Sequence, residues 1–304
     1  MFIFIYKLSY YKMKTLSTYI QEKLIIKKSK GFKYFPSTNE ELRQVIKEKS
    51  KDVKVLDVSD IDISEISNMF RAFDNSTNVQ EIIGLDNWDV SHVTSFQKMF
   101  NCCTNVLHIK GLENWDVSNG KTFLGMFSGC HNLKSLDVSK WEFDKDNTIE
   151  FGSLFEHCTT LENLDLSNWD LSNAASISHM FLDCRSLKSI GDISNWNISS
   201  NCKHMDGFMQ FCTEINNIGN ISNWNVSKSF NLKNMFNGCV KLQSIGDISK
   251  WKINLIIDFE NMFRDCKNLK LNISSWQLHP SANLRNAFKN VDVKIFKRCR
   301  HKRP

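Results

Sequence analysis

The stretch LKSLDVSKW, residues 133–141, carries apolar residues at a spacing that decides the fold. Leu133, Leu136, Val138 and Trp141 are separated by polar residues. Because successive side chains of a short strand point to opposite sides, Leu136 and Val138 are predicted to point inward and Asp137 outward. Similar stretches recur along the chain, so the repeat has to be defined before any single motif is interpreted.

All eight tryptophans of the chain stand in one register, 25 to 28 residues apart, at Trp88, Trp115, Trp141, Trp169, Trp196, Trp224, Trp251 and Trp276. Further along each unit, a Phe or Met position is followed three residues later by a cysteine column, namely Cys103, Cys130, Cys158, Cys184, Cys212, Cys239 and Cys266. One unit of this length cannot bury its apolar side alone. The repeat therefore predicts coils that stack into a solenoid.

Each unit is predicted to run strand, turn, helix. The tripeptide DVS after each tryptophan is typical of a helix N-cap, and VTSFQKMF, residues 93–100, has apolar residues at helical spacing. Before the repeats, PSTNEELRQVIKEK, residues 36–49, contains the capping boxes Ser37 with Glu40 and Thr38 with Glu41. The sequence thus predicts an α/β solenoid of about eight strand-turn-helix coils of 27 residues, with an N-terminal helical cap.

This organisation divides the chain into four segments. Residues 1–30 form a basic leader with a short amphipathic helix, and residues 31–56 form the capping helix and its connection. Residues 57–289 form the solenoid, and residues 290–304 form a basic tail. The leader has no basic residue before its apolar start and no small-residue cleavage site, so we expect no signal peptide. No apolar run approaches the roughly 18 residues of a membrane span.

The formal charge of +6 is unevenly distributed. Residues 1–30 contribute +6 and residues 294–304 contribute another +6, which leaves 6 − 12 = −6 for the body between them. A mildly acidic body argues against the solenoid itself gripping a phosphate backbone. The tail KRCRHKRP could bind nucleic acid or an acidic partner, or it could be a solvated end.

No motif indicates catalysis, a metal site or a cofactor. The cysteines form no C-x-x-C pair, so a small buried residue is favoured over a metal or disulfide ladder, and Cys202 and Cys299 are expected to be the exposed thiols. The histidines form no ligand spacing such as H-E-x-x-H and are expected at the surface, and no G-x-S-x-G or phosphate-binding glycine loop occurs. We therefore expect a protein that is not an enzyme.

The unit NWDVSHVTSFQKMFNCCTNVLHIKGLENWDVS, residues 87–118, resembles the repeat of the BspA-like leucine-rich-repeat family, also called the mycoplasma lipoprotein repeat of unknown function. The resemblance covers residues 38–289. It implies a leucine-rich-repeat-like solenoid that acts in protein binding or adhesion and brings no catalytic residues. No lipoprotein cysteine follows the leader, as in signal-less viral and phage-type members. The resemblance thus implies a location in the host cell or in the virion of a giant virus or phage.

Two rows of polar residues are predicted to point outward from the strands, Ser135, Asn163, Ser189, Asn217 and Ser244 in one row and Asp137, Asp165, Asp192, Asn220 and Asp247 in the other. Repeat solenoids bind proteins through such extended concave surfaces. We therefore expect a non-enzymatic interaction module with an unknown protein partner. The alternatives are a merely solvated face, nucleic-acid association through the tail, and an adhesin on a cell or virion surface.

Overall fold

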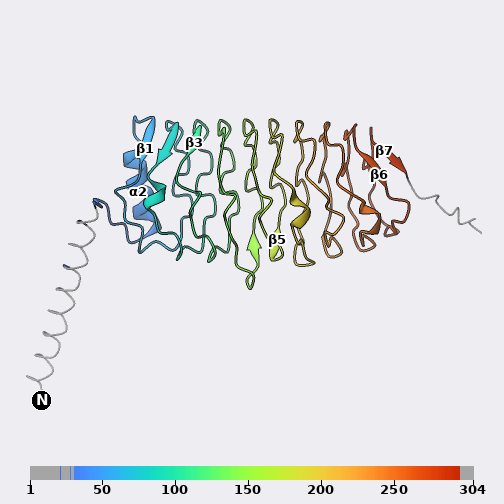
Figure 1. The fold of residues 1–304 in the computed structure, drawn as a ribbon, viewed down its shortest axis with the longest axis horizontal. Helices are drawn as coiled ribbons and strands as arrows, with labels where there is room; N and C mark the ends of the chain where they lie inside the picture. Colours follow the sequence, from blue (N-terminus) through green and yellow to red (C-terminus); the bar gives the residue numbers. More distant parts are fainter. Residues whose placement is uncertain (1–20, 22–27, 29–30, 295–304) are drawn as a thin grey trace, which may run out of the picture.

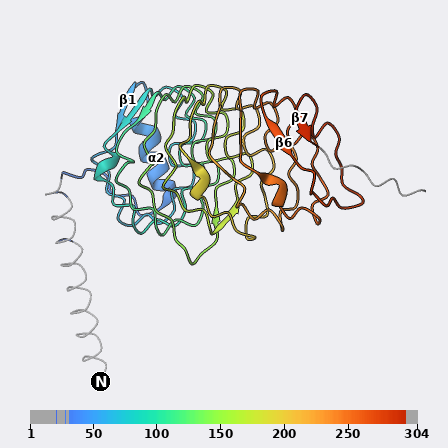
Figure 2. The ribbon, with the colours of Figure 1, turned by 45° about the vertical axis from the view of Figure 1, so that its right-hand side comes forward.

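The computed structural model describes residue 21, residue 28 and residues 31–294. Residues 31–294 contain coils stacked side by side along one long axis (Figure 1). The amphipathic helix predicted in the leader and most of the basic tail lie outside the described residues. Turning the molecule by 45° shows the same stack, with α2 near one end and β6 and β7 near the other (Figure 2).

The strands are short and every pair is parallel. One sheet contains β1 (Val55–Asp57), β2 (Glu81–Ile83) and β3 (His108–Ile109), a second contains β4 (Ile149–Glu150) and β5 (Ala174–Ser176), and a third contains β6 (Lys270–Asn272) and β7 (Asp292–Lys294). Isolated parallel bridges continue the pairing between them, for example from His108 to Ser135 and from Asn163 to Ser189. Short 3-10 turns complete the elements, η1 (Leu85–Asn87), η2 (Ile193–Asn195) and η3 (Ile248–Lys250).

The helix α2 (Asn39–Lys49) lies where the capping boxes predict a helix. The Thr38 side chain accepts a hydrogen bond from the Glu41 amide, and the Glu41 carboxylate accepts from the Ser37 amide and hydroxyl. Leu42 and Ile46 are buried in the core of the solenoid. The side chain of Asn39 donates to the backbone carbonyls of Asn68 and Phe70 at 3.0 and 3.1 Å. Helix α2 is thus joined to the first coil by both apolar and polar contacts.

The prediction of a helix within each coil is wrong. Residues 95–103 form a chain of turns, in which the Met99 amide donates to the Phe96 carbonyl three residues back. Every second amide instead donates to the next coil, as Phe96 does to Thr122 at 2.9 Å and Phe100 to Met126 at 2.8 Å. We call this segment and its equivalents the turn runs: residues 68–76, 95–103, 122–130, 150–158, 176–184, 204–212, 231–239, 258–266 and 283–291.

Left-handed backbone positions distinguish the turn run from a helix. In residues 95–103 these are Lys98 and Cys102, with φ of +54° and +56°. The same two positions are left-handed in the other coils and hold Gly125 with Gly129 in the next one. Two left-handed residues in nine are incompatible with a right-handed helix. The DVS tripeptide correspondingly forms a turn rather than an N-cap, since the Asp89 carboxylate accepts from the Ser91 amide at 3.0 Å.

The spacing between neighbouring coils explains why turn runs, rather than helices, occur in this stack. Packed helices lie about 8–10 Å apart, whereas neighbouring strands lie about 4.8 Å apart, so helices on one side force a repeat array to fan open. Direct hydrogen bonds between successive turn runs give both sides of the coil the narrow spacing. The concave sheet face predicted from the sequence required helices on the outer side of each coil. Because the turn runs replace those helices, there is no longer a physical reason to expect a concave face.

The core runs the length of the stack as columns of identical side chains. The tryptophans are at most 5% exposed, and successive indoles stack, as Trp141 does on Trp169 with ring centres 6.3 Å apart. The Phe column stacks in the same way, with Phe127 and Phe155 at 5.6 Å. Leu136 and Val138 are buried and Asp137 is exposed, which confirms the predicted inward and outward positions.

Candidate interaction surface

The ten predicted binding residues lie at the outward strand positions and the turns that follow them. We call these ten residues the outer ladder. All are exposed except Ser189, which is half-buried. Parallel bridges join the Asn163 and Ser189 positions and the Asn217 and Ser244 positions of adjacent coils. The structure thus places the ten residues at equivalent exposed or half-buried positions of successive coils.

The acidic row has a local structural role that the sequence analysis did not assign. The Asp137 carboxylate accepts hydrogen bonds from the Ser139 amide and hydroxyl at 3.1 and 2.7 Å, which closes a turn. The same turn is closed by the other four members of the row, Asp165, Asp192, Asn220 and Asp247. These hydrogen bonds hold the pKa of Asp137 below its usual value, so it is ionised at neutral pH. Each side chain uses one oxygen for the turn.

The other row is less uniform. Ser189, Asn217 and Ser244 accept a hydrogen bond from the amide of the glycine two residues later, at 2.9 to 3.2 Å. Ser135 lies 3.4 Å from the Nδ1 atom of His108. The side chain of Asn163 makes no hydrogen bond within the described part of the chain. Asn163 is consequently the member of this row best placed to bind another molecule.

Ion pairs between coils flank the outer ladder and were missed by the sequence analysis. Lys188 pairs with Glu162 and Lys241 with Glu214, each at 2.6 Å. Because water screens these side chains, each pair contributes little to stability. They make the surface beside the ladder zwitterionic rather than acidic. The signal was present in the sequence, since the partners of each pair stand 26 or 27 residues apart.

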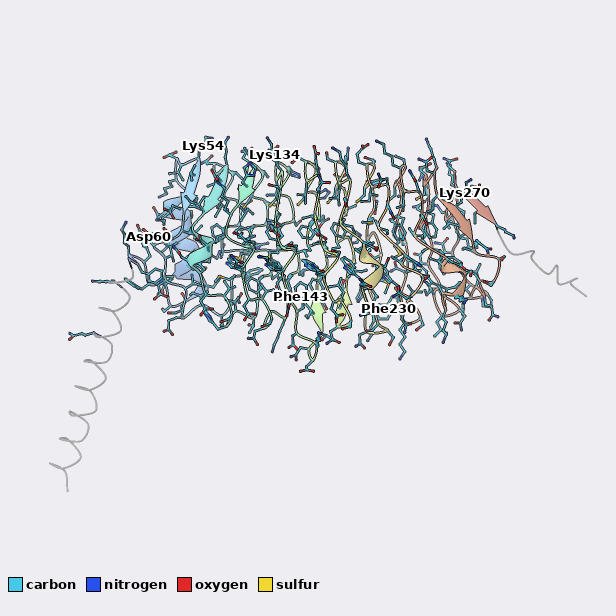
Figure 3. The ribbon with its side chains drawn as sticks, in the orientation of Figure 1. Lys54, Asp60, Lys134, Phe143, Phe230 and Lys270 are labelled. Atoms are coloured by element: carbon cyan, nitrogen blue, oxygen red, sulfur yellow. The ribbon has the colours of Figure 1, made fainter. Side chains whose placement is uncertain are left out.

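Exposed apolar residues lie on the opposite long side. Phe230, Leu255 and Ile257 are 58%, 67% and 52% exposed, and the Phe230 ring meets the His204 ring at 5.0 Å. Figure 3 shows Phe230 on the lower side, whereas Lys54, Lys134 and Lys270 lie on the upper side, where Figure 1 places β1, β3 and β6. These exposed residues were not predicted from the sequence. The signal was present, because Phe230 and Ile257 occupy positions at which other coils carry polar residues, such as Thr94 and Lys121.

The cysteine column is part of the core, as predicted. Each column thiol is buried and donates to a backbone carbonyl of the preceding coil, as Cys158 does to Phe127 at 3.3 Å. Burial raises the pKa of the Cys158 thiol to about 12. The expectation that Cys202 is exposed is wrong, because Cys202 is fully buried and its pKa is also raised by burial to about 12. Cys299 lies outside the described residues.

Buried neutral thiols predict a loss of stability at alkaline pH. An unfolded cysteine ionises near pH 9, whereas folded Cys158 keeps its proton up to about pH 12. The contribution to stability is therefore complete below pH 9 and is lost as the pH rises toward 12, at about 1.4 kcal/mol per pH unit for each thiol. Urea unfolding at pH 8, 9, 10 and 11 measures this slope. Cys158→Ala should show a shallower decline than the unchanged protein, and parallel slopes would contradict the assignment.

The stretch around Asp89 and His92 lines a surface recess of about 540 Å³ together with Phe32, Asn87 and other residues. Both polar side chains already have local partners. The Asp89 carboxylate binds Ser91, and His92 Nε2 lies 3.3 Å from the Ile63 carbonyl. Within the described residues, no three His, Cys, Asp or Glu side chains are grouped as metal ligands. The same residues include no helix long and apolar enough to span a membrane.

The fold and its residue columns define a leucine-rich-repeat-like solenoid. The chain belongs to the family described as "Mycoplasma protein of unknown function, DUF285", whose profile matches residues 40–150, 104–220 and 188–297. This membership confirms the resemblance inferred from the repeat. Among curated proteins, no sequence matches the chain.

Several solved structures of leucine-rich-repeat proteins are similar to the chain at low sequence identity. A protein of Leptospira interrogans is 14% identical over 76% of this chain and 52% of its own, with a TM-score of 0.30. A protein of Eubacterium ventriosum is 12% identical over 83% and 86%, with a TM-score of 0.29. A leucine-rich cell surface protein of Faecalibacterium prausnitzii is 17% identical over 80% and 79%, with a TM-score of 0.26. The chain spans about half the length of the first.

Proposed function

We propose that the protein is a non-enzymatic interaction module that binds a protein partner across the outer ladder. The observation that carries the proposal is the alignment of exposed polar side chains in two rows, held in register by parallel bridges between coils. A surface whose backbone is already hydrogen-bonded and whose turns are closed changes little on binding, so it keeps more of the contact energy as affinity.

Both the turn bonds and the flanking ion pairs support this proposal. Each Asp of the ladder retains one carboxylate oxygen beyond the turn that it closes, and the Lys188–Glu162 and Lys241–Glu214 pairs add both signs of charge beside it. Such a surface suits a partner that carries hydrogen-bond donors, with contacts spread over several coils. The family membership is consistent with this role and leaves the partner open.

The experiment is affinity capture from cells with the full chain and two arginine variants. Asn163→Arg with Asn217→Arg places two cations in the outer ladder. Asn114→Arg with Asn168→Arg makes the same change at exposed asparagines beside the tryptophans. The first variant should lose the captured protein, since a desolvated mismatched charge costs several kcal/mol at an interface, whereas the second should retain it. Equal capture by both variants would exclude the outer ladder as the binding surface.

A third variant, with Lys297, Arg298 and Arg300 replaced by glutamine, tests the basic tail. If nucleic acid alone is recovered, and only with the native tail, the interaction-module proposal fails.

The helix α2 is proposed to cap the array, because its buried face and Asn39 occupy the place where a preceding coil would pack. Asn39→Ala should speed amide exchange in residues 68–76 and leave residues 258–266 unchanged. A location inside the host cell or the virion, including a viral origin, likewise stays a proposal from the sequence. N-glycosylation at Asn197 or Asn225 in cells would contradict it, because that modification marks secreted proteins.

A further inference from the structure

The backbone hydrogen bonds between turn runs all have the same direction. In each run, the alternate amides donate to carbonyls of the following coil, as Asn234 does to Glu260 and Phe236 to Met262, both at 2.9 Å. The last of these bonds run from Asn261 to Arg285 and from Asp265 to Lys289, again at 2.9 Å. The backbone of the turn runs is therefore polar along the stack, with its alternate amides facing the C-terminal end and its acceptor carbonyls facing the N-terminal end.

This polarity leaves different groups at the two ends. At the N-terminal end, carbonyls of the first turn run face outward, and the Asn39 side chain donates to those of Asn68 and Phe70. At the C-terminal end, the equivalent amides belong to Leu284, Asn286, Phe288 and Asn290. These four amides have no acceptor within the described part of the chain. We call them the donor edge.

An apolar surface and a strand edge continue the donor edge. Leu284, Phe288 and Val293 are only partly buried, although their equivalents in the preceding coil, Phe259, Phe263 and Leu271, are buried. Strand β7 follows at once and is paired with β6 on one side only within the described residues. A strand edge is a template for pairing with another chain, and it presents both donors and acceptors.

The charged side chains at this end are mostly basic. Lys270, Lys289 and Lys294 are exposed, and Asp292 is the opposing acid on β7. Arg285 lies 3.5 Å from Glu260 of the preceding coil, so its charge is partly compensated. An acidic occupant is therefore favoured, because aligned amides and lysines both attract negative groups.

A second copy of the chain does not match this edge. Two C-terminal ends would place donors against donors. The N-terminal end of another copy has the complementary carbonyls, but Asn39 already donates to two of them and α2 packs over that end. The occupant must bring its own acceptors, and the apolar surface with the strand edge favours a peptide over a phosphate backbone.

We propose that the C-terminal end of the solenoid binds an acidic peptide segment of a partner protein, whose backbone carbonyls accept from the donor edge as those of a following turn run do in inner coils. The free edge of β7 adds the strand-addition mode of peptide recognition, in which backbone bonds supply affinity and side-chain contacts supply selectivity. The proposal shares with the outer ladder only the assumption of a protein partner, and it concerns a separate surface.

The test uses the full chain and a defined probe, a twelve-residue peptide of alternating Glu and Val. Its controls are the Lys and Val counterpart and a twelve-nucleotide oligo-dT. Hydrogen exchange is read at the four donor-edge amides. They should exchange rapidly in the free protein and about tenfold more slowly with the acidic peptide, because a hydrogen-bonded amide exchanges only through opening. Neither control should slow them.

Substitutions separate this edge from other surfaces. Lys289→Glu with Lys294→Glu should weaken binding of the acidic peptide about tenfold, as expected for two exposed charges reversed at a binding rim. Lys134→Glu, an exposed lysine on the strand side, should leave binding unchanged, and so should the Asn163→Arg and Asn217→Arg pair. If that pair abolishes binding, the peptide lies on the outer ladder and the donor-edge proposal fails.

Three further results would overturn the proposal. The four amides could already be as protected in the free protein as those of Asn261 and Asp265, which would mean that the edge is occupied. The peptide could bind without slowing them, which would assign binding to charge alone. The oligo-dT could slow them while the acidic peptide does not, which would assign the edge to a phosphate backbone.

Discussion

Trp169→Ala should destabilise the protein by about 3–5 kcal/mol, the usual cost of emptying a large aromatic site in a packed core. The Trp169 side chain is 1% exposed, and its ring lies 6.3 Å from that of Trp141 and 4.8 Å from that of Phe143. Its Nε1 atom donates to the Val138 carbonyl at 2.9 Å. Urea unfolding followed by far-ultraviolet circular dichroism measures the loss, and a change below about 1 kcal/mol would contradict this packing.

A matched pair of substitutions separates the indole hydrogen bond from the ring. Trp224 is also buried, but its Nε1 atom has no acceptor among the residues that the structure describes. Trp169→Phe should therefore lower the free energy of unfolding by about 1 kcal/mol more than Trp224→Phe does. The first substitution breaks a hydrogen bond to the preceding coil, whereas the second removes a donor that makes no hydrogen bond. Equal losses at the two positions would show that the bond to the preceding coil contributes nothing to stability.

His179→Pro should be the most disruptive change at a position that is not fully buried. His179 has φ of +54°, and its amide donates to the Asp206 carbonyl of the next coil at 2.9 Å. Proline requires φ near −65° and has no amide hydrogen, so it breaks both the turn and the bond between coils, at a cost of about 3 kcal/mol or more. The measurement is again urea unfolding, together with hydrogen exchange along residues 176–212.

The control at the same position is His179→Gly. Glycine adopts positive φ without strain and keeps the amide, but it increases the freedom of the unfolded chain, so the net change should stay within about 1 kcal/mol. The contact between His179 Nε2 and the Asp206 carboxylate is long, at 3.7 Å between half-buried side chains, and contributes little. If glycine were as damaging as proline, the side chain rather than the backbone would be responsible.

The coil period and the buried columns were predictable from the sequence. The positions of Trp141, Leu136 and Cys130 hold the same or a similar apolar residue in most units, and a column of such residues has only the interior in which to stack. The outward position of Asp137 followed from alternation in a short strand. These predictions depended on local spacing and composition alone.

The turn runs were mistaken for helices because apolar residues at Val93, Phe96, Met99 and Phe100 fit both structures. Chains of turns and helices repeat at about three to four residues, so the apolar spacing does not distinguish them. A second signal was available. The positions equivalent to Lys98 and Cys102 hold Gly, Asn or Asp in most coils, and these residues favour positive φ.

The outer ladder was predictable as a set of exposed positions, but its local bonding was not. Asp137 closes a turn with Ser139 because of the direction that the backbone takes after the strand. Phe230 is exposed because the neighbouring coils do not cover its ring. Cys202 shows the reverse case, because it stands outside the repeat column and is nevertheless buried.

By itself, the sequence determined the length of the coil and the composition of its core, since each unit repeats the same apolar residues at the same spacing. Only the tertiary structure decided how the coils are joined. The bonds that join them run between residues of neighbouring coils, such as Phe100 and Met126, and their common direction arises from alternate amides of the turn runs. That direction, which leaves acceptors at one end and donors at the other, is a property of the stacked backbone and has no signature in any single repeat.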